Sequence, residues 1–166
     1  MYKFFKSNFL VTVFVSFGFL AALYLVGRNQ EGRPEASFVG GFMSLTSASG
    51  ADLRVGDEFE LEINGTVETG VQVNLATTRI CFGSQIRLWN EVDLFNNVIL
   101  GPDFVELSKL EKEGNCLKMV LSADGDGLEW GNESHLIARV RFKAISVGNG
   151  TITIDPVASS MAGMKG

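Results

Sequence analysis

The sequence predicts an all-β protein, a jelly-roll-like β-sandwich of about eight to nine strands preceded by one N-terminal transmembrane helix. Three observations support this prediction: segments with alternating apolar and polar residues, turn-forming pairs between those segments, and almost no helical periodicity in the domain. The 166 residues suffice for one domain with a substantial core.

The chain begins with Lys3 and Lys6, followed by a predominantly apolar segment from Phe9 to Val26. As a helix, this segment would span about 27 Å, close to the hydrocarbon thickness of a bilayer. The lysines place the N-terminus in the cytoplasm by the positive-inside rule, and the rest outside. We therefore expect three parts: a membrane anchor at 1–27, a linker at 28–41 and the sandwich domain at 42–166.

A cleaved signal peptide is the alternative for the N-terminal segment, because its positive start fits both interpretations. The apolar stretch is long for a signal peptide, and Leu25 and Gly27 make a poor cleavage site. A buried soluble helix would need a polar face, which this segment lacks. We prefer the uncleaved anchor.

The portion after the anchor is acidic. It contains 12 of the Lys and Arg residues and all 19 Asp and Glu residues, so its net charge is −7. Such a domain is a poor partner for nucleic acid or anionic lipid headgroups.

The chain has two cysteines, Cys81 and Cys116, in separate strand-like segments. Outside the cytoplasm they could form a disulfide, which would stabilise the fold by roughly 3–4 kcal/mol in the chain-entropy model. The alternative is two free buried thiols that pack as small hydrophobic groups.

Two segments, Glu58–Asn64 and Cys116–Ser122, alternate strictly and predict half-buried strands. Their predicted inward residues are Phe59, Leu61, Ile63, Leu117, Met119 and Leu121. A third strand starts with Val71, Val73 and Leu75 on one face, and Phe42–Gly50 forms an opening strand. The segment Phe82–Leu110 is ambiguous between strands and short helical turns.

The stretch Leu136–Asp155 alternates most regularly and predicts a hairpin. Gly148-Asn149-Gly150 is the expected turn, since these residue types tolerate positive φ. The expected core face is Leu136, Ala138, Val140, Phe142 and Ala144, and Ile137, Arg139, Arg141 and Lys143 form the outer face.

Four segments, in this order, resemble a cohesin-type domain of the carbohydrate-binding-module-like superfamily: "FMSLTSASG", "LRVGDEFELEI", "GVQVNL" and "HLIARVRFKAISVGNGTITID". Val55-Gly56-Asp57 matches the family's turn into its second long strand, and the likeness extends over Phe42–Ala158. Where many relatives carry a "Y-D-P-x-x-L" element, this chain has "TTRICFGSQIRL". The resemblance therefore leaves open which face binds.

The resemblance implies a non-catalytic binding module. Cohesins bind dockerin modules of other proteins through one sheet face and assemble polysaccharide-degrading complexes, and other sandwiches of the superfamily bind polysaccharide. Two Trp and two Tyr residues favour a protein partner over a carbohydrate. A structural subunit of a surface filament or adhesion assembly is a further alternative, although the apolar segment lacks a prepilin-like glycine and glutamate.

No catalytic motif is visible, and we expect no enzyme activity. His135 is the only histidine, and general acid–base catalysis needs a positioned partner. Trp89 and Trp130 lie in or beside predicted loops and are candidate binding residues, with core packing as the alternative.

We expect no cofactor, with calcium as the exception to consider. In the segment from Ser122 to Ser134, Asp124, Asp126 and Glu133 resemble positions of a calcium-binding loop. Ser122 stands where such loops begin with Asp, and the flanks are strand-like. An acidic turn is therefore the preferred interpretation.

Overall fold

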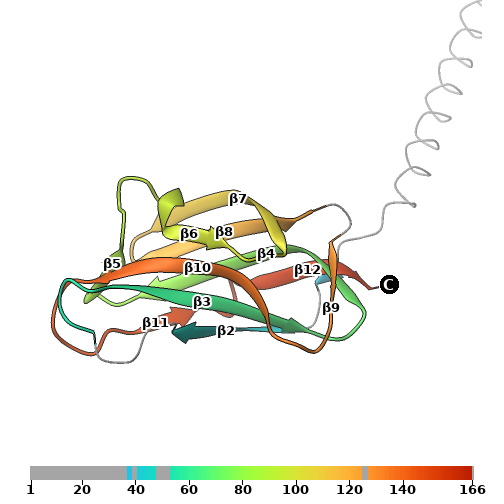
Figure 1. Ribbon diagram of the computed structural model, residues 1–166, viewed down its shortest axis with the longest axis horizontal. Coiled ribbons are helices and arrows are strands. Elements are labelled where there is room, and N and C mark those ends of the chain that lie inside the picture. Colours follow the sequence, from blue (N-terminus) through green and yellow to red (C-terminus); the bar gives the residue numbers. More distant parts are fainter. Residues whose placement is uncertain (1–36, 39–40, 48–52, 125–126, 166) are drawn as a thin grey trace, which may run out of the picture. The chain divides into compact units, whose positions relative to one another are not determined.

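The structure is a computed structural model that describes residues 37–38, 41–47, 53–124 and 127–165 (Figure 1). The predicted membrane anchor at 1–27 lies outside the described residues. No helix within the described part of the chain is long and apolar enough to cross a membrane.

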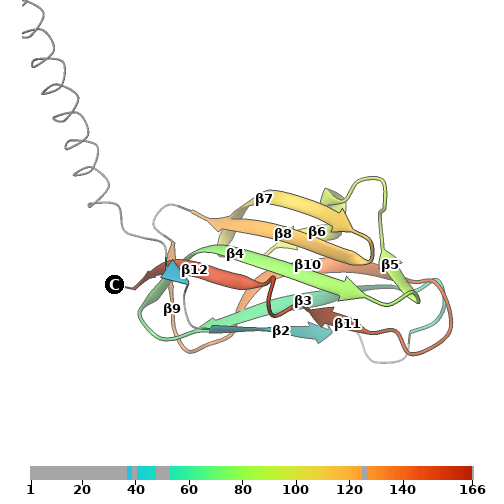
Figure 2. The same cartoon turned by 180° about the vertical axis from the view of Figure 1, so that it is seen from behind.

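The described residues form a sandwich of two sheets in which every strand pair is antiparallel (Figures 1 and 2). The seven-stranded sheet has the order β1 (Ser37–Phe38), β12 (Ser160–Lys165), β4 (Val71–Phe82), β8 (Cys116–Ala123) and β7 (Phe104–Glu113), and β9 (Leu128–Trp130) and β11 (Ile152–Ile154) also pair with β4. The five-stranded sheet has the order β2 (Gly41–Ser47), β3 (Glu58–Val67), β10 (His135–Ala144) and β5 (Ile86–Leu88), and β6 (Val98–Leu100) also pairs with β10.

The predicted all-β sandwich is confirmed, but the predicted strand number is too low for the described residues, which contain β1–β12. The excess consists of the short strands β1, β5, β6 and β9, whose two or three residues are too few to show an alternating pattern in the sequence. One of them, β1, lies within the segment 28–41 that the sequence assigns to the linker, and it pairs with β12.

The core lies between the two sheets, and the apolar residues of the strictly alternating segments point into it. The predicted inward residues of β3 and β8 are all buried. Aromatic rings join the two layers: Phe142 of β10 stacks on Phe59 of β3 at 5.7 Å and meets Phe82 of β4 edge-on at 5.5 Å. Burial of side chains this large supplies much of the free energy that holds the sheets together.

Two bulges change which side chains face the core. On β4, the pairing with β12 skips Asn74, so Val73 and Ala76 both point inward and Leu75 points outward. The predicted inward position of Leu75 is therefore wrong. On β10, a register shift between Leu136 and Ala138 buries Ile137, which the alternating pattern assigns to the outer face.

The predicted hairpin at Leu136–Asp155 is wrong. β10 belongs to the five-stranded sheet, whereas β11 pairs with β4 in the other sheet. Residues 145–151 therefore cross from one sheet to the other, and Gly148, with φ of 137°, takes a conformation that other residues rarely adopt. A glycine-rich turn looks the same in sequence whether it joins paired strands or connects two sheets.

The ambiguous middle segment contains β5, a 3₁₀ turn η1 (Phe95–Asn97) and β6. The buried side chain of Asn97 organises the loop before β6. Its Oδ1 accepts a hydrogen bond from the Asn90 N–H, and its Nδ2 donates to the Asn90, Asp93 and Leu94 carbonyl oxygens. These bonds replace the regular backbone pairing that the loop lacks.

Candidate functional site: the outer face of the seven-stranded sheet

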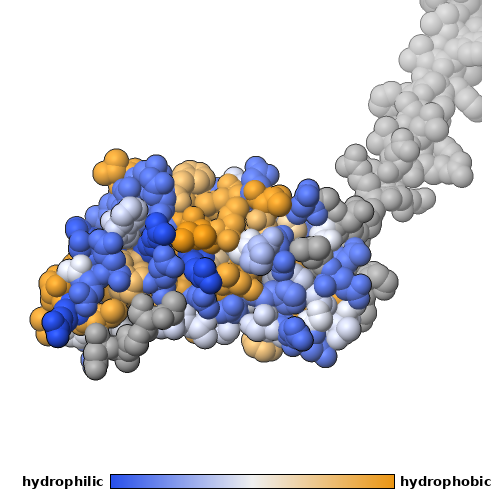
Figure 3. Space-filling model, in the orientation of Figure 1, coloured by the Kyte–Doolittle hydropathy of each residue, from blue (hydrophilic) through white to orange (hydrophobic). Residues whose placement is uncertain are grey.

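The outer face of the five-stranded sheet is covered by a ladder of ion pairs between β3 and β10. Glu62, Glu60 and Glu58 pair with Arg139, Arg141 and Lys143, at 2.9, 2.9 and 3.5 Å. Figure 3 views this face: hydrophilic residues extend across β3 and β10, and apolar residues gather beside them over β6. The charges of the ladder are satisfied within the domain.

The outer face of the seven-stranded sheet has a different character. Five uncharged side chains lie together on β12, β4 and β8, and we call them the neutral patch: Leu75, Thr77, Val120, Ser122 and Ala162. Each is half-buried. Their strands adjoin in the view of Figure 2.

The strand register explains why the patch is continuous. Leu75 of β4 lies between Ser122 of β8 and Ala162 of β12, and Thr77 lies opposite Val120. Directly opposite side chains on adjacent strands are close enough to touch. The bulge at Asn74 is essential, because without it Leu75 would point into the core.

Charged residues border the neutral patch on β4, β8 and β7. Arg79 lies opposite Lys118, and Lys118 lies opposite Glu111 of β7. On the other side, Ser122 is hydrogen-bonded to Ser108, with 2.7 Å between the hydroxyl oxygens. An uncharged centre with a charged border is the arrangement found in many protein–protein interfaces.

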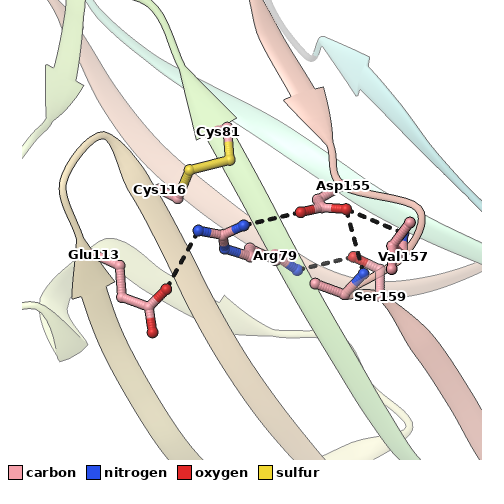
Figure 4. Close-up of a disulfide and its surroundings, with 8 residues drawn as sticks. Arg79, Cys81, Glu113, Cys116, Asp155, Val157 and Ser159 are labelled. Atoms are coloured by element: carbon pink, nitrogen blue, oxygen red, sulfur yellow. Dashed lines mark hydrogen bonds and ion pairs between the residues drawn. A yellow bond between two sulfur atoms is a disulfide. The ribbon is translucent and has the colours of Figure 1, made fainter.

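Arg79 and a disulfide fix one end of this face (Figure 4). Arg79 forms ion pairs with Asp155 at 2.9 Å and with Glu113 at 3.3 Å, and its backbone N–H donates to Ser159 Oγ. The Arg79 guanidinium, together with the backbone N–H of Val157, holds the pKa of Asp155 below its usual value. These bonds connect β4, β7 and the segment between β11 and β12.

The comparisons with known proteins bear on the fold. No protein-family model matches the chain, and no curated protein matches it. Among solved structures, a cohesin of Clostridium acetobutylicum matches with TM-score 0.54 and 14% identity over 74% of this chain and 79% of that one. A cohesin in a type I cohesin–dockerin complex from Clostridium thermocellum matches with TM-score 0.52 and 10% identity over 74% and 87%.

A third solved structure has the same fold. The sixth cohesin of scaffoldin B from Acetivibrio cellulolyticus, in complex with a dockerin, matches with TM-score 0.52 and 11% identity over 70% of this chain and 82% of that one. The described domain has the cohesin fold. At such low identity the likeness concerns the fold and does not assign a ligand.

Trp130 belongs to the core of the sandwich, which corrects its assignment as a candidate binding residue. Its side chain is 1% exposed and packs edge-on against Phe104 at 6.1 Å. A Cβ on Gly65 would lie 2.9 Å from the indole ring, so the ring fills the space that the glycine leaves. The indole Nε1 has no hydrogen-bond partner among the described residues. A ring buried in this way has no face to offer a ligand.

Trp89 is the more accessible of the two tryptophans, with 38% of its surface exposed. The Arg141 guanidinium lies 5.7 Å from the ring centroid, a cation–π contact. The ring borders a shallow depression of about 410 Å³ that Arg87, Asn90 and Lys143 also line. Trp89 lies beside the ion-pair ladder, on the other sheet from the neutral patch.

The predicted calcium loop is only partly described. Asp124 and Glu133 are exposed, and Asp126 lies outside the described residues. The described residues contain no group of three or more potential His, Cys, Asp or Glu ligands. The acidic turn therefore stays the preferred interpretation of this segment, and calcium binding stays the untested alternative.

His135 and the cysteines have structural contacts in the sandwich. The His135 ring stacks on Trp130 at 4.5 Å, and its Nδ1 lies 3.0 Å from Asp103 Oδ2. Cys81 of β4 and Cys116 of β8, the candidate disulfide pair, are joined by an S–S bond. Sequence reasoning missed the neutral patch itself; the lack of charge at Thr77 and Val120, in strands that alternate, is the signal that could have found it.

Proposed function

We propose that this protein is a non-catalytic, cohesin-like binding module that attaches a dockerin-like module of another protein through the neutral patch. The observation that carries the proposal is the contrast between the two sheet faces. One face has its charges paired within the domain, and the other has an uncharged centre inside a charged border.

Physical reasoning favours the seven-stranded sheet as the binding face. Burying Leu75 and Ala162 against a partner removes apolar surface from water without stripping water from a charge, and Val120 adds apolar surface at the border with Lys109. Covering the ion-pair ladder would instead desolvate Glu60 and Arg141, which attraction between the two only partly offsets. The Clostridium thermocellum and Acetivibrio cellulolyticus cohesins were solved in complex with dockerins, which supports this class of partner.

The test is a binding titration with the full chain, purified in mild detergent, against a panel of purified dockerin modules with and without calcium. Val120→Glu places a charge within the neutral patch, between Thr77 and the bordering Lys109 of β7, and should weaken binding about tenfold or more. The matched control is Ile99→Glu, a half-buried β-branched residue on β6 of the other sheet, which should leave affinity unchanged.

The result can exclude the proposal in two ways. If no dockerin module binds the unmodified chain, the proposed partner class is wrong. If Ile99→Glu weakens binding and Val120→Glu does not, the partner is retained but the neutral patch is not its site. Circular dichroism melting curves of both variants show whether a loss of binding follows from a loss of fold.

Carbohydrate binding at Trp89 is the second candidate function. A partly exposed indole beside Arg87, Asn90 and Lys143 combines a stacking surface with hydrogen-bond donors, as a sugar ring requires. Retention of the full chain on a polysaccharide, lost in Trp89→Ala, would favour this function and a direct role in polysaccharide attachment.

The proposed location is the outer side of a membrane, with residues 1–27 as the anchor and the N-terminus in the cytoplasm. This proposal rests on the apolar segment and on Lys3 and Lys6. Protease added to intact cells should then remove the domain and leave an N-terminal fragment in the membrane fraction. A filament or adhesion subunit would instead sediment as a large assembly after detergent extraction.

A further inference from the structure

Two of the longer described strands, β7 and β2, lie at sheet edges. They differ in whether their sequence protects the edge against pairing with a further strand. Edge strands expose backbone N–H and C=O groups, and soluble proteins usually protect them with charges, proline or bulges. β7 follows this rule, since it carries Lys109, Glu111 and Lys112 and has register shifts in its pairing with β8. β7 is therefore a poor site for further strand pairing.

β2 at the edge of the five-stranded sheet has none of these protections. Its sequence, GFMSLTS, contains no charged residue and no proline, and its pairing with β3 runs without a register shift. Among the described strands it pairs with β3 alone. Figures 1 and 2 both place β2 at the margin of the five-stranded sheet, away from β10. Within the part of the chain that the structure describes, no strand pairs with the outer edge of β2, where a further strand could be added.

The side chains of β2 are arranged for such an addition. Met43 and Leu45 are half-buried and pack against the core, while Ser44 and Thr46 are exposed. Phe42 is 66% exposed and lies on the outer side of the strand with Ser44 and Thr46. An added strand would cover the remaining apolar surface of Met43 and Leu45.

We infer that β2 pairs antiparallel with β2 of a second copy of this chain, around a twofold axis at Ser44. In that register Met43 lies opposite Leu45 of the second copy, and Phe42 lies opposite Thr46 of the second copy. Inward-facing residues meet inward-facing residues, so the two cores become continuous through the joined sheets. No charge meets a like charge across the new pair.

The neighbouring charges permit this arrangement. Glu62 of β3 lies opposite Thr46, and it is the acidic group nearest the centre of β2 in the β2–β3 register. Its carboxylate is paired with Arg139 at 2.9 Å, on the side away from β2. A register centred on Ser44 also uses the middle of the strand, so it forms more backbone pairs than any register centred elsewhere. The symmetric contact closes on itself and forms a dimer, with no free β2 edge left for a third copy.

A dimer of this kind would have a consequence for the proposed function. The neutral patches lie on the seven-stranded sheets, so joining the five-stranded sheets leaves both patches accessible. Two patches in one assembly would raise the effective concentration at a partner that carries two binding modules. The dimer does not depend on that function, because its interface is on the other sheet.

The test is cysteine cross-linking of the full chain in mild detergent. Directly opposite residues have Cα atoms about 4.5–5.5 Å apart, within the range of a disulfide. Ser44→Cys should therefore give a disulfide-linked dimer on a non-reducing gel. The matched control is Thr46→Cys, also exposed on β2, whose two copies would lie about 13 Å apart along the strands.

We expect a several-fold higher dimer yield from Ser44→Cys than from Thr46→Cys. A mixture of the Phe42→Cys and Thr46→Cys proteins should cross-link more than either protein alone, since the register places these two positions opposite each other. Equal yields from Ser44→Cys and Thr46→Cys would mean random collisions and would overturn the inference. A monomeric Ser44→Cys protein that retains the wild-type circular dichroism spectrum would overturn it as well, and would leave the edge for an extended segment of another protein.

Discussion

Cys81 of β4 and Cys116 of β8 are direct neighbours across the seven-stranded sheet, and a disulfide joins them. The two residues are 35 positions apart in the sequence. The covalent bond therefore closes a loop that contains β5, β6 and β7. Arg79, two residues from Cys81 on the same strand, adds ion pairs with Glu113 and Asp155 at this end of the sheet.

Removing the disulfide should lower stability substantially. In the chain-entropy model, a loop of this length stabilises the folded state by roughly 3–4 kcal/mol, because the bond restricts the unfolded chain. We expect the Cys81→Ala/Cys116→Ala double variant to unfold at lower denaturant concentration with a similar folded spectrum. Urea titration of wild-type protein with and without a reductant is the independent check; an unchanged midpoint in both experiments would contradict the prediction.

Truncation of the two tryptophans should destabilise the fold by very different amounts. Trp130→Ala removes a fully buried side chain and should destabilise the fold by about 3–5 kcal/mol. Trp89→Ala removes a partly exposed ring with a cation–π contact to Arg141 and should cost about 1 kcal/mol or less. Thermal unfolding measures both, and a larger loss from Trp89→Ala would contradict the assignment of Trp130 to the core.

The depressed pKa of Asp155 predicts part of the acid sensitivity. Because its folded-state pKa lies below the unfolded value, Asp155 contributes stability above the unfolded pKa of about 3.9, and this contribution is lost as pH falls through the folded pKa. Asp155→Asn should therefore be less stable than wild type at neutral pH, and the difference should shrink in strong acid. Melting temperatures between neutral and acidic pH measure it. A stability difference that stays the same from neutral to strongly acidic pH would contradict the prediction.

Although the ion-pair ladder extends across the face of its sheet, it should contribute little to the stability of the fold. Glu60 and Arg141 are each about one third or more exposed, so water and salt screen their attraction. A double-mutant cycle with Glu60→Ala and Arg141→Ala should give a coupling of about 0.2–1 kcal/mol that falls with added salt. A salt-independent coupling well above that range would show that the pair is effectively buried.

Strict alternation made part of the fold predictable. In β3 and β8, a period of two places Ile63 and Met119 in the core, and the structure agrees. Prediction failed where one extra residue changes the period. The bulge at Asn74 turns Leu75 outward, and the shift after Leu136 buries Ile137, because a bulge depends on the partner strand and leaves no mark in its own sequence.

The remaining predictions failed because they depend on contacts between segments that are distant in the sequence. The segment after Ala144 has the composition of a hairpin turn, but Ile152 finds its partner in Phe82 of the other sheet. The burial of Trp130 depends on the space above Gly65, a residue of β3, which is distant from Trp130 in the sequence. The neutral patch likewise combines residues of β4, β8 and β12, and no single segment contains enough of them to be recognised.

The central position of β4 constrains when this domain can fold. Every strand that pairs with β4 follows it in the chain, and the first of them begins only at Cys116. A growing or translocating chain therefore cannot form the seven-stranded sheet until most of the domain has emerged. Such distant pairings are typical of slow folding, on the order of milliseconds to seconds. Until β8 and β12 arrive, the backbone edges of β4 stay unpaired, and the chain at that stage is most vulnerable to aggregation and proteolysis.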